Sequence, residues 1–327
     1  MSSSPVGNFR HFDINSMPYF YDKPLATAVY RCSPEDFLVN EILDVQASDG
    51  GEHLWILVSK RDQNTSWVAG LLAKLVGIPR NSVGFCGLKD RFAVTRQWFS
   101  LHLPGQELDL DVLEHPDFDV LKAVRQNRKL RRGMHNGNQF RIVLHDFFVD
   151  DSDLQKRIEC IQAHGVPNYF GEQRFGHQGN NLFEVQKLVD NEGLKGNRHG
   201  KGLFLSAARS WLYNLVLARW IEKTHQSLKD IIPSDGPLWG RGRSNATPLV
   251  ADIEHEVLND WQDWCYALEH AGLKQQRRAF IMYPTNIVAQ WLSPGKLCLH
   301  FSLTSGCYAT SLLREIAELS KPIRTSL

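Results

Sequence analysis

The chain has 327 residues, 43% of them hydrophobic and 22% charged, with a net charge of +1 at neutral pH. This length predicts a sizeable core and two domains, and the composition is that of an ordinary globular protein. No apolar run reaches the roughly 18 residues of a membrane span, and the amino terminus lacks the apolar stretch of a secretory signal, so we expect a cytoplasmic protein.

The first half of the chain predicts strands mixed with a helix. His53–Ser59 is a continuous apolar run, as expected of a buried strand. A short apolar helix follows the candidate caps Asn64, Thr65 and Ser66 and ends at Gly77. Thr95–Leu103 and Gln139–His145 alternate between apolar and polar residues, which is typical of strands with one face on a core.

The middle of the chain changes character. Gly193–Gly202 is rich in glycine and basic residues and is interpreted as a loop, after which Ser206 is expected to cap a helix. After Pro233 the sequence is loop-like again. The end of the chain again mixes strand and helix patterns, as the first half does, with a strand predicted over Leu297–Leu303 and a helix over Ser311–Leu319. A helix-and-loop middle between two strand-bearing ends indicates an inserted domain.

Charge is distributed unevenly along the chain. No Asp or Glu occurs between Val120 and His145, and the basic residues there are Lys122, Arg125, Arg128, Lys129, Arg131, Arg132 and Arg141. A compensating acidic stretch contains Asp252, Glu254, Glu256, Asp260 and Asp263. A near-neutral total therefore conceals a polarised surface, and the basic run is suited to contact phosphates.

The cysteines indicate free thiols. All six are scattered and none forms a CxxC pair, whereas zinc and iron–sulfur sites place ligands in close pairs. We therefore expect no metal site.

The segment Ser82–Ser100 carries the candidate chemistry. A short strand runs into Gly87, which permits a tight turn, and Asp90 follows on the loop. Lys89, Arg91 and Arg96 surround this carboxylate, and nearby cations keep a carboxylate ionised for nucleophilic attack or pairing. Taken alone, such a segment is more often a solvated surface loop.

Six segments taken together resemble one family. They are SPEDFLVNE, GLKDRFAVTRQ, NGNQF, VPNYFGEQRFG, LSAARSWLYN and SGCYATSLLRE. In this order they resemble the tRNA pseudouridine synthase D (TruD) family, and they span nearly the whole chain.

The resemblance implies the α/β (α+β) pseudouridine-synthase fold, with a curved, largely antiparallel mixed sheet and flanking helices. The catalytic domain would comprise residues 1–165 and 283–327, and the family's own α/β domain would be inserted at 166–282. The implied activity is isomerisation of a uridine of tRNA, at position 13 in the D-stem region, without a cofactor. We expect tRNA as the partner and a monomer.

The resemblance also implies roles for individual residues. Asp90 would be the nucleophile, and Arg31 the basic residue that pairs with it. The uracil pocket would be lined by Phe37, Asn138, Phe140 and Tyr308. An asparagine suits a base edge because its amide has both a donor and an acceptor, although an asparagine in such a position more often caps a turn.

Isomerisation breaks the N-glycosidic bond, turns the base and joins C5 to the same sugar carbon. A carboxylate can attack C6 of the uracil or C1′ of the ribose, and the sequence leaves both open. Two other functions also remain open: a pseudouridine synthase with another RNA as its main target, and a non-catalytic protein that binds or folds RNA on the same scaffold.

Overall fold

The computed structural model describes Phe12, 16–46, 48, 50–190, 198–224 and 234–322, with side chains of the 198–224 helix from residue 202 onward. The chain divides into two compact units, one of Pro24–Gly165 and Tyr283–Leu327, the other of the residues up to Lys23 with Val166–Met282. The described residues 16–23 group with the central segment, whereas the resemblance implies a catalytic domain of residues 1–165 and 283–327.

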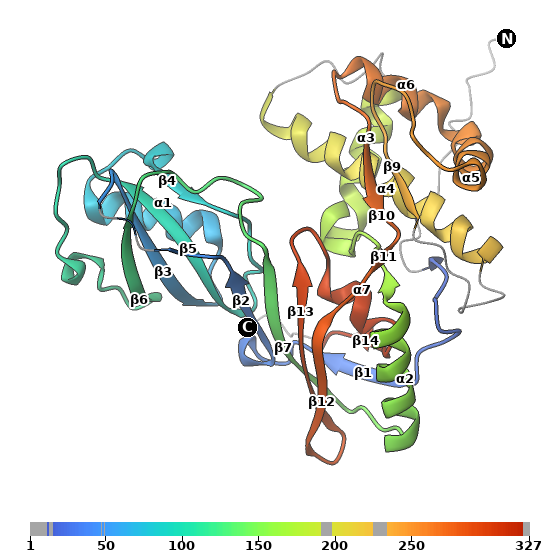
Figure 1. Ribbon diagram of the computed structural model, residues 1–327, viewed down its shortest axis with the longest axis horizontal. Coiled ribbons are helices and arrows are strands. Elements are labelled where there is room, and N and C mark those ends of the chain that lie inside the picture. Colours follow the sequence, from blue (N-terminus) through green and yellow to red (C-terminus); the bar gives the residue numbers. More distant parts are fainter. Residues whose placement is uncertain are drawn as a thin grey trace, which may run out of the picture. The chain divides into compact units, whose positions relative to one another are not determined.

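A ten-stranded sheet organises the first unit, in the order β12-β13-β7-β2-β5-β3-β6, with β1 and β14 attached beside β7 and β4 attached to β5 (Figure 1). The strands are β1 (Ala26–Tyr30), β2 (Phe37–Ile42), β3 (His53–Arg61), β4 (Val83–Phe85), β5 (Val94–His102), β6 (Phe118–Gln126), β7 (Gly137–His145), β12 (Thr285–Ser293), β13 (Lys296–Thr304) and β14 (Ala317–Ser320). Only the β1–β14 and β2–β5 pairs are parallel among the paired strands described. The mixed α/β fold class predicted from the sequence is confirmed.

Three α-helices belong to this unit in the described residues: α1 (Thr65–Val76), α2 (Asp151–His164) and α7 (Ala309–Leu313). Short 3-10 turns occur at η2 (Pro34–Asp36), η3 (Arg80–Ser82) and η4 (Leu110–Leu113). As predicted, α1 follows Asn64 and ends at Gly77, whose φ of 71° is readily adopted by glycine.

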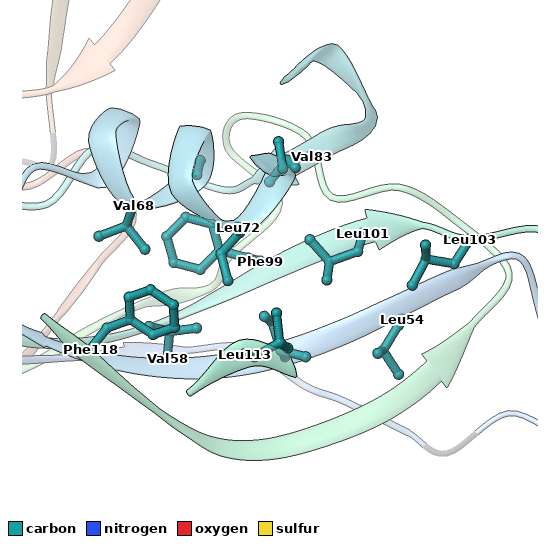
Figure 2. Packing of buried hydrophobic residues seen from close by; sticks show 13 residues of the cluster. Leu54, Val58, Val68, Leu72, Val83, Phe99, Leu101, Leu103, Leu113 and Phe118 are labelled. Carbon is teal, nitrogen blue, oxygen red and sulfur yellow. The ribbon is translucent and has the colours of Figure 1, made fainter. Parts of the chain in front are cut away.

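One core of this unit lies between α1 and the sheet. Figure 2 shows Val68 and Leu72 of α1 facing Val58 of β3 and Phe99 and Leu101 of β5. All five side chains have 0% exposure. Burial of each such side chain contributes about 1.5–3 kcal/mol, so this packing fixes α1 and the start of the Asp90 loop against the sheet.

The second unit consists mainly of helices. They are α3 (Asn180–Asp190), α4 (Arg198–Thr224), α5 (Pro248–Leu258) and α6 (Gln262–His270), with 3-10 turns η5 (Glu172–Phe175), η6 (His177–Gly179) and η8 (Asn259–Trp261). Two small antiparallel sheets accompany them, β9 (Asp235–Leu238) with β10 (Gln276–Ala279) and β8 (Val166–Pro167) with β11 (Ile281–Met282). The β8–β11 pair places the two ends of the central segment side by side, as an inserted domain requires.

Three local predictions were wrong. Ser206 lies inside α4, which begins at Arg198, so it is not a cap; residues 193–197 of the predicted loop lie outside the described residues. The loop predicted after Pro233 contains the strand β9, which pairs with β10. The predicted helix over Ser311–Leu319 ends at Leu313, and Ala317–Ser320 is a strand paired with β1. At both strands, pairing with a distant segment overrides a weak local preference. No helix of the described residues is long and apolar enough to cross a membrane.

Candidate active site

A buried polar network holds the loop Gly87–Asp90. The Lys89 backbone N–H donates to Thr65 Oγ1 at 3.0 Å, and the Thr65 hydroxyl donates to Gln97 Oε1 at 2.7 Å. The Gln97 amide in turn donates to the Gly87 carbonyl oxygen at 3.2 Å. Thr65 and Gln97 are 1% and 0% exposed. Because a buried polar group left without a partner is costly, this closed set of bonds defines one loop conformation.

Asp90 pairs with Arg31, as the resemblance implied. The guanidinium donates to Asp90 Oδ2, and the side chains of Arg31 and Asp90 are 11% and 25% exposed. The same guanidinium lies 4.0 Å from the ring centroid of Phe37, which is a cation–π contact. Of the described residues, none donates a hydrogen bond to Asp90 Oδ1, so one carboxylate oxygen is held and the other keeps its lone pairs.

Arg31 itself has an unusual backbone, with φ at 60°. A non-glycine residue in this left-handed region stores about 1 kcal/mol or more of strain, and such residues cluster at functional sites. It lies between β1 and the turn η2. The backbone strain at Arg31 therefore accompanies the placement of its charge at Asp90.

The Lys60 side chain is hydrogen-bonded to the backbone of the Asp90 loop. Its amino group donates to the backbone oxygens of Gln63 at 2.6 Å and Asp90 at 3.3 Å, and the residue is 1% exposed. Burial, with the nearby charge of Lys89, lowers the pKa of the Lys60 amino group from 10.5 to about 8, against the opposing effect of Asp90. The apolar run predicted as this strand ends at Ser59, so it gave no indication of the buried lysine that follows.

The sheet places three predicted pocket residues on one face. Val39 of β2 lies opposite Phe140 of β7, and Phe37 opposite Ile142, so Phe37, Asn138 and Phe140 share that face through the two-residue period of a strand. Phe37 and Phe140 are 2% and 6% exposed, with ring centroids 6.2 Å apart. Both rings therefore form an apolar floor, whereas Asn138 is only half-buried.

Tyr308 is half-buried at the N-cap position of α7. The turn before it is tied to the start of β7, because Thr304 pairs with Gly137 and the Ser305 N–H donates to the Asn136 carbonyl oxygen at 3.0 Å. The fold thus brings the Tyr308 turn to the end of β7 that carries Asn138.

Glu41 is a site residue that sequence reasoning missed. Its carboxylate Oε2 lies 2.9 Å from Lys89 Nζ, with side-chain exposures of 0% for Glu41 and 5% for Lys89. The other oxygen accepts the Trp98 N–H at 3.1 Å. A signal was present, because Phe37, Val39 and Glu41 share one face of β2, and a carboxylate on an apolar face needs a buried partner.

Among the described residues, three side chains of the kinds that bind metal ions lie close together. They are Cys32, Asp36 and His145, and their potential ligand atoms lie within 4.8 Å of one another. The Asp36 carboxylate already accepts the Ser33 N–H at 2.8 Å and lies 3.0 Å from His145 Nε2. Burial and the carboxylates of Asp36 and Asp146 raise the pKa of the Cys32 thiol. These contacts fix the turn η2, which presents Phe37 to Arg31.

The arrangement combines a half-buried carboxylate on a rigid loop, a cation holding one of its oxygens, an apolar floor and a half-buried amide. That combination suits nucleophilic attack on a planar polar ring, because the nucleophile is held in place and the ring has both a surface to lie on and a hydrogen-bonding group beside it.

Comparisons with known proteins agree on one family. The family model described as tRNA pseudouridine synthase D (TruD) matches residues 13–197. A tRNA pseudouridine synthase D from Cellvibrio japonicus is 41% identical over 312 residues, which cover 93% of this chain and 93% of the relative. A protein of the same name from Aeromonas salmonicida is 39% identical over 337 residues, covering 93% and 95%.

Similarity extends to a solved structure. The crystal structure from Methanosarcina mazei described as a tRNA pseudouridine synthase D superposes with a TM-score of 0.66 over 92% of this chain and 95% of that one. The two sequences are 20% identical, so this likeness supports the fold.

Proposed function

The chain belongs to the tRNA pseudouridine synthase D family, and we propose that it isomerises a uridine of tRNA to pseudouridine with Asp90 as the nucleophile. The target proposed is the uridine at position 13 in the D-stem region. The observation that carries the proposal is the Arg31–Asp90 pair on a loop fixed by buried polar groups.

The geometry suggests how the nucleophile works. Arg31 holds Oδ2, which leaves Oδ1 to form the bond to C6 of the uracil or C1′ of the ribose. Attack at C6 is followed by cleavage of the N-glycosidic bond, whereas attack at C1′ displaces the base directly. The base then turns, C5 bonds to C1′, the bond to Asp90 Oδ1 breaks, and the proton lost from C5 is matched by one gained at N1. No group is gained or lost overall, so the reaction as written calls for no redox or group-carrying cofactor.

The target base must leave its stack to reach Asp90. We propose that Asn138 and Tyr308 contact the base and that Phe37 and Phe140 form the floor beneath it. The exposures support this division, because the two phenylalanines are buried and the other two residues are half-buried. Stacking on aromatic side chains stabilises a bound base by about 1–3 kcal/mol, which offsets part of the free-energy cost of unstacking it from the RNA.

The basic run between β6 and β7 is proposed to hold the RNA backbone. Of the described residues, no carboxylate lies within 4.0 Å of the side chains of Arg128, Lys129, Arg131 or Arg132. This run is joined to the Asp90 segment, because the Gly133 N–H donates to the Cys86 carbonyl oxygen at 2.8 Å. Arg132 also lies 4.5 Å from the ring centroid of Phe85, at the end of β4. Phosphates bound here would lie beside the loop that carries the nucleophile.

Substitution of Asp90 tests the proposal. Asp90→Asn keeps the side-chain shape but removes the nucleophile, so single-turnover conversion of unmodified tRNA should fall at least about a thousand-fold while tRNA affinity changes little. Asp119→Asn, an exposed carboxylate on β6, is the matched control and should convert tRNA like the unaltered protein.

Chemical mapping of pseudouridine identifies the target. Pseudouridine should appear at position 13 of unmodified tRNA, and a tRNA carrying cytidine at position 13 should acquire no pseudouridine at any position. Appreciable conversion by Asp90→Asn would refute the nucleophile, and no conversion by the unaltered protein would favour a non-catalytic RNA-binding function.

A further inference from the structure

Lys89 connects two side chains from neighbouring strands. Glu41 of β2 and Asn138 of β7 are directly opposite in the ladder, so their side chains lie on the same face. Lys89 Nζ lies between them, 2.9 Å from Glu41 Oε2 and 2.6 Å from Asn138 Oδ1. The Lys89 and Glu41 side chains are almost fully buried, so their positions are set by the core.

This contact fixes the direction of the Asn138 amide. A lysine amino group can donate hydrogen bonds but a charged one cannot accept any, so the amide oxygen has to face Lys89. Glu41 holds that amino group and is itself held by the Trp98 N–H at 3.1 Å. The Asn138 Nδ2 group consequently points away from Lys89, and none of the described residues accepts a hydrogen bond from it. The amide thus presents its NH₂ donor, and its oxygen is turned toward Lys89 with one lone pair engaged.

We propose that Lys89 and Glu41 orient Asn138 so that it recognises the target base by donating a hydrogen bond to a carbonyl oxygen of uracil, at position 2 or 4. The inference rests on the proposed function. A freely rotating amide could instead accept from the N3–H of the base, and the Lys89 contact disfavours that option because it turns the amide oxygen toward a buried side chain. If the contact is with O4, cytosine is disfavoured, because its 4-amino group is itself a donor and would leave Asn138 unpaired.

Recognition and catalysis share one loop in this arrangement. Lys89 and Asp90 are adjacent, and the Lys89 backbone is bonded to buried Thr65. The same rigid segment therefore holds the nucleophile and sets the polarity of the amide that orients the base. Lys89 and Glu41 are positioning residues, since they act through Asn138.

The test replaces the target uridine in a synthetic tRNA by 2-thiouridine, 4-thiouridine or 3-methyluridine. Sulfur accepts hydrogen bonds poorly, whereas 3-methyluridine lacks the N–H but keeps both oxygens. With the unaltered protein, one of the two thio substitutions should lower single-turnover conversion by about ten-fold, the worth of one hydrogen bond. The position of the effective sulfur identifies the oxygen contacted.

Variants then separate orientation from general structure. In Asn138→Ala the thio effect should disappear. In Lys89→Met the amide can turn over, so the thio effect should shrink below about three-fold and 3-methylation should become more harmful than in the unaltered protein. A residue with a merely structural role would lower all rates together and leave these ratios unchanged.

Asn138→Asp covers the case in which Lys89→Met fails to fold. It keeps the size of the side chain and an oxygen toward Lys89 but has no N–H to donate, so conversion of unmodified tRNA should fall by about ten-fold with no further thio effect. Equal rates on uridine and both thiouridines with the unaltered protein, or thio effects unchanged in Lys89→Met, would overturn the inference. Failure of the unaltered protein to convert unmodified tRNA would instead refute the proposed function.

Discussion

Replacing Glu41 by Gln should destabilise the sheet strongly, although the two side chains have the same shape. The Glu41 and Lys89 side chains are 0% and 5% exposed and their charged atoms are 2.9 Å apart. Removing one partner of a buried ion pair leaves an uncompensated charge and costs about 3–5 kcal/mol. The amide adds a second conflict. Whichever way it turns, its NH₂ group faces a donor, either Lys89 or the Trp98 N–H.

The double variant Glu41→Gln/Lys89→Met should recover much of this loss. With the charge gone, the glutamine oxygen can accept the Trp98 N–H and its NH₂ group can donate to Asn138 Oδ1. We therefore expect the double variant to be more stable than either single variant, by about 2 kcal/mol or more, and the two single changes to be strongly non-additive.

Hydrogen exchange of the β2, β5 and β7 amides in increasing urea is the suitable assay, because the two units of the chain need not unfold together. Glu107→Gln is the control, since the Glu107 side chain is 99% exposed and pairs with Arg125 at 3.7 Å; it should change stability by less than about 0.5 kcal/mol. Additive single changes, or an effect of Glu41→Gln no larger than that of the control, would refute the reasoning.

Three further outcomes are expected. Between pH 8 and 10.5 the Lys60 amino group is protonated in the unfolded chain but has lost its proton in the folded chain. The free energy of unfolding should therefore rise across this window, by up to about 3 kcal/mol relative to Lys60→Met. A difference between the two proteins that does not depend on pH would contradict the buried amine. Phe140→Ala removes a ring that is 6% exposed and whose centroid lies 5.2 Å from that of Phe301. The free energy of unfolding, measured by denaturation, should fall by about 3–5 kcal/mol, and an unchanged value would contradict a packing role for the ring. Replacing Arg128, Lys129, Arg131 and Arg132 by Gln should flatten the plot of log tRNA affinity against log salt by roughly one unit per lost contact, and an unchanged slope would place the RNA elsewhere.

Local patterns in the sequence determined much of this protein. Alternating residues predicted β5, β7 and β13, because a strand with one face on a core must repeat every two residues. The turn signals predicted the end of α1 and the loop of Asp90. The six ordered segments identified the family, and with it the proposed nucleophile.

Other features depended on contacts between distant parts of the chain. The segment ending in Ala317–Ser320 has a helical composition, yet pairing with β1 makes it a strand. Glu41 and Asn138 become neighbours only through the register of β2 against β7, and Lys89 reaches both only because buried Thr65 and Gln97 fix its loop. Side chains 97 residues apart in sequence, Glu41 and Asn138, cannot be paired from a local pattern, since register is decided by the packing of the whole sheet. The sequence could therefore suggest which residues act, and the tertiary structure decided which way the Asn138 amide faces.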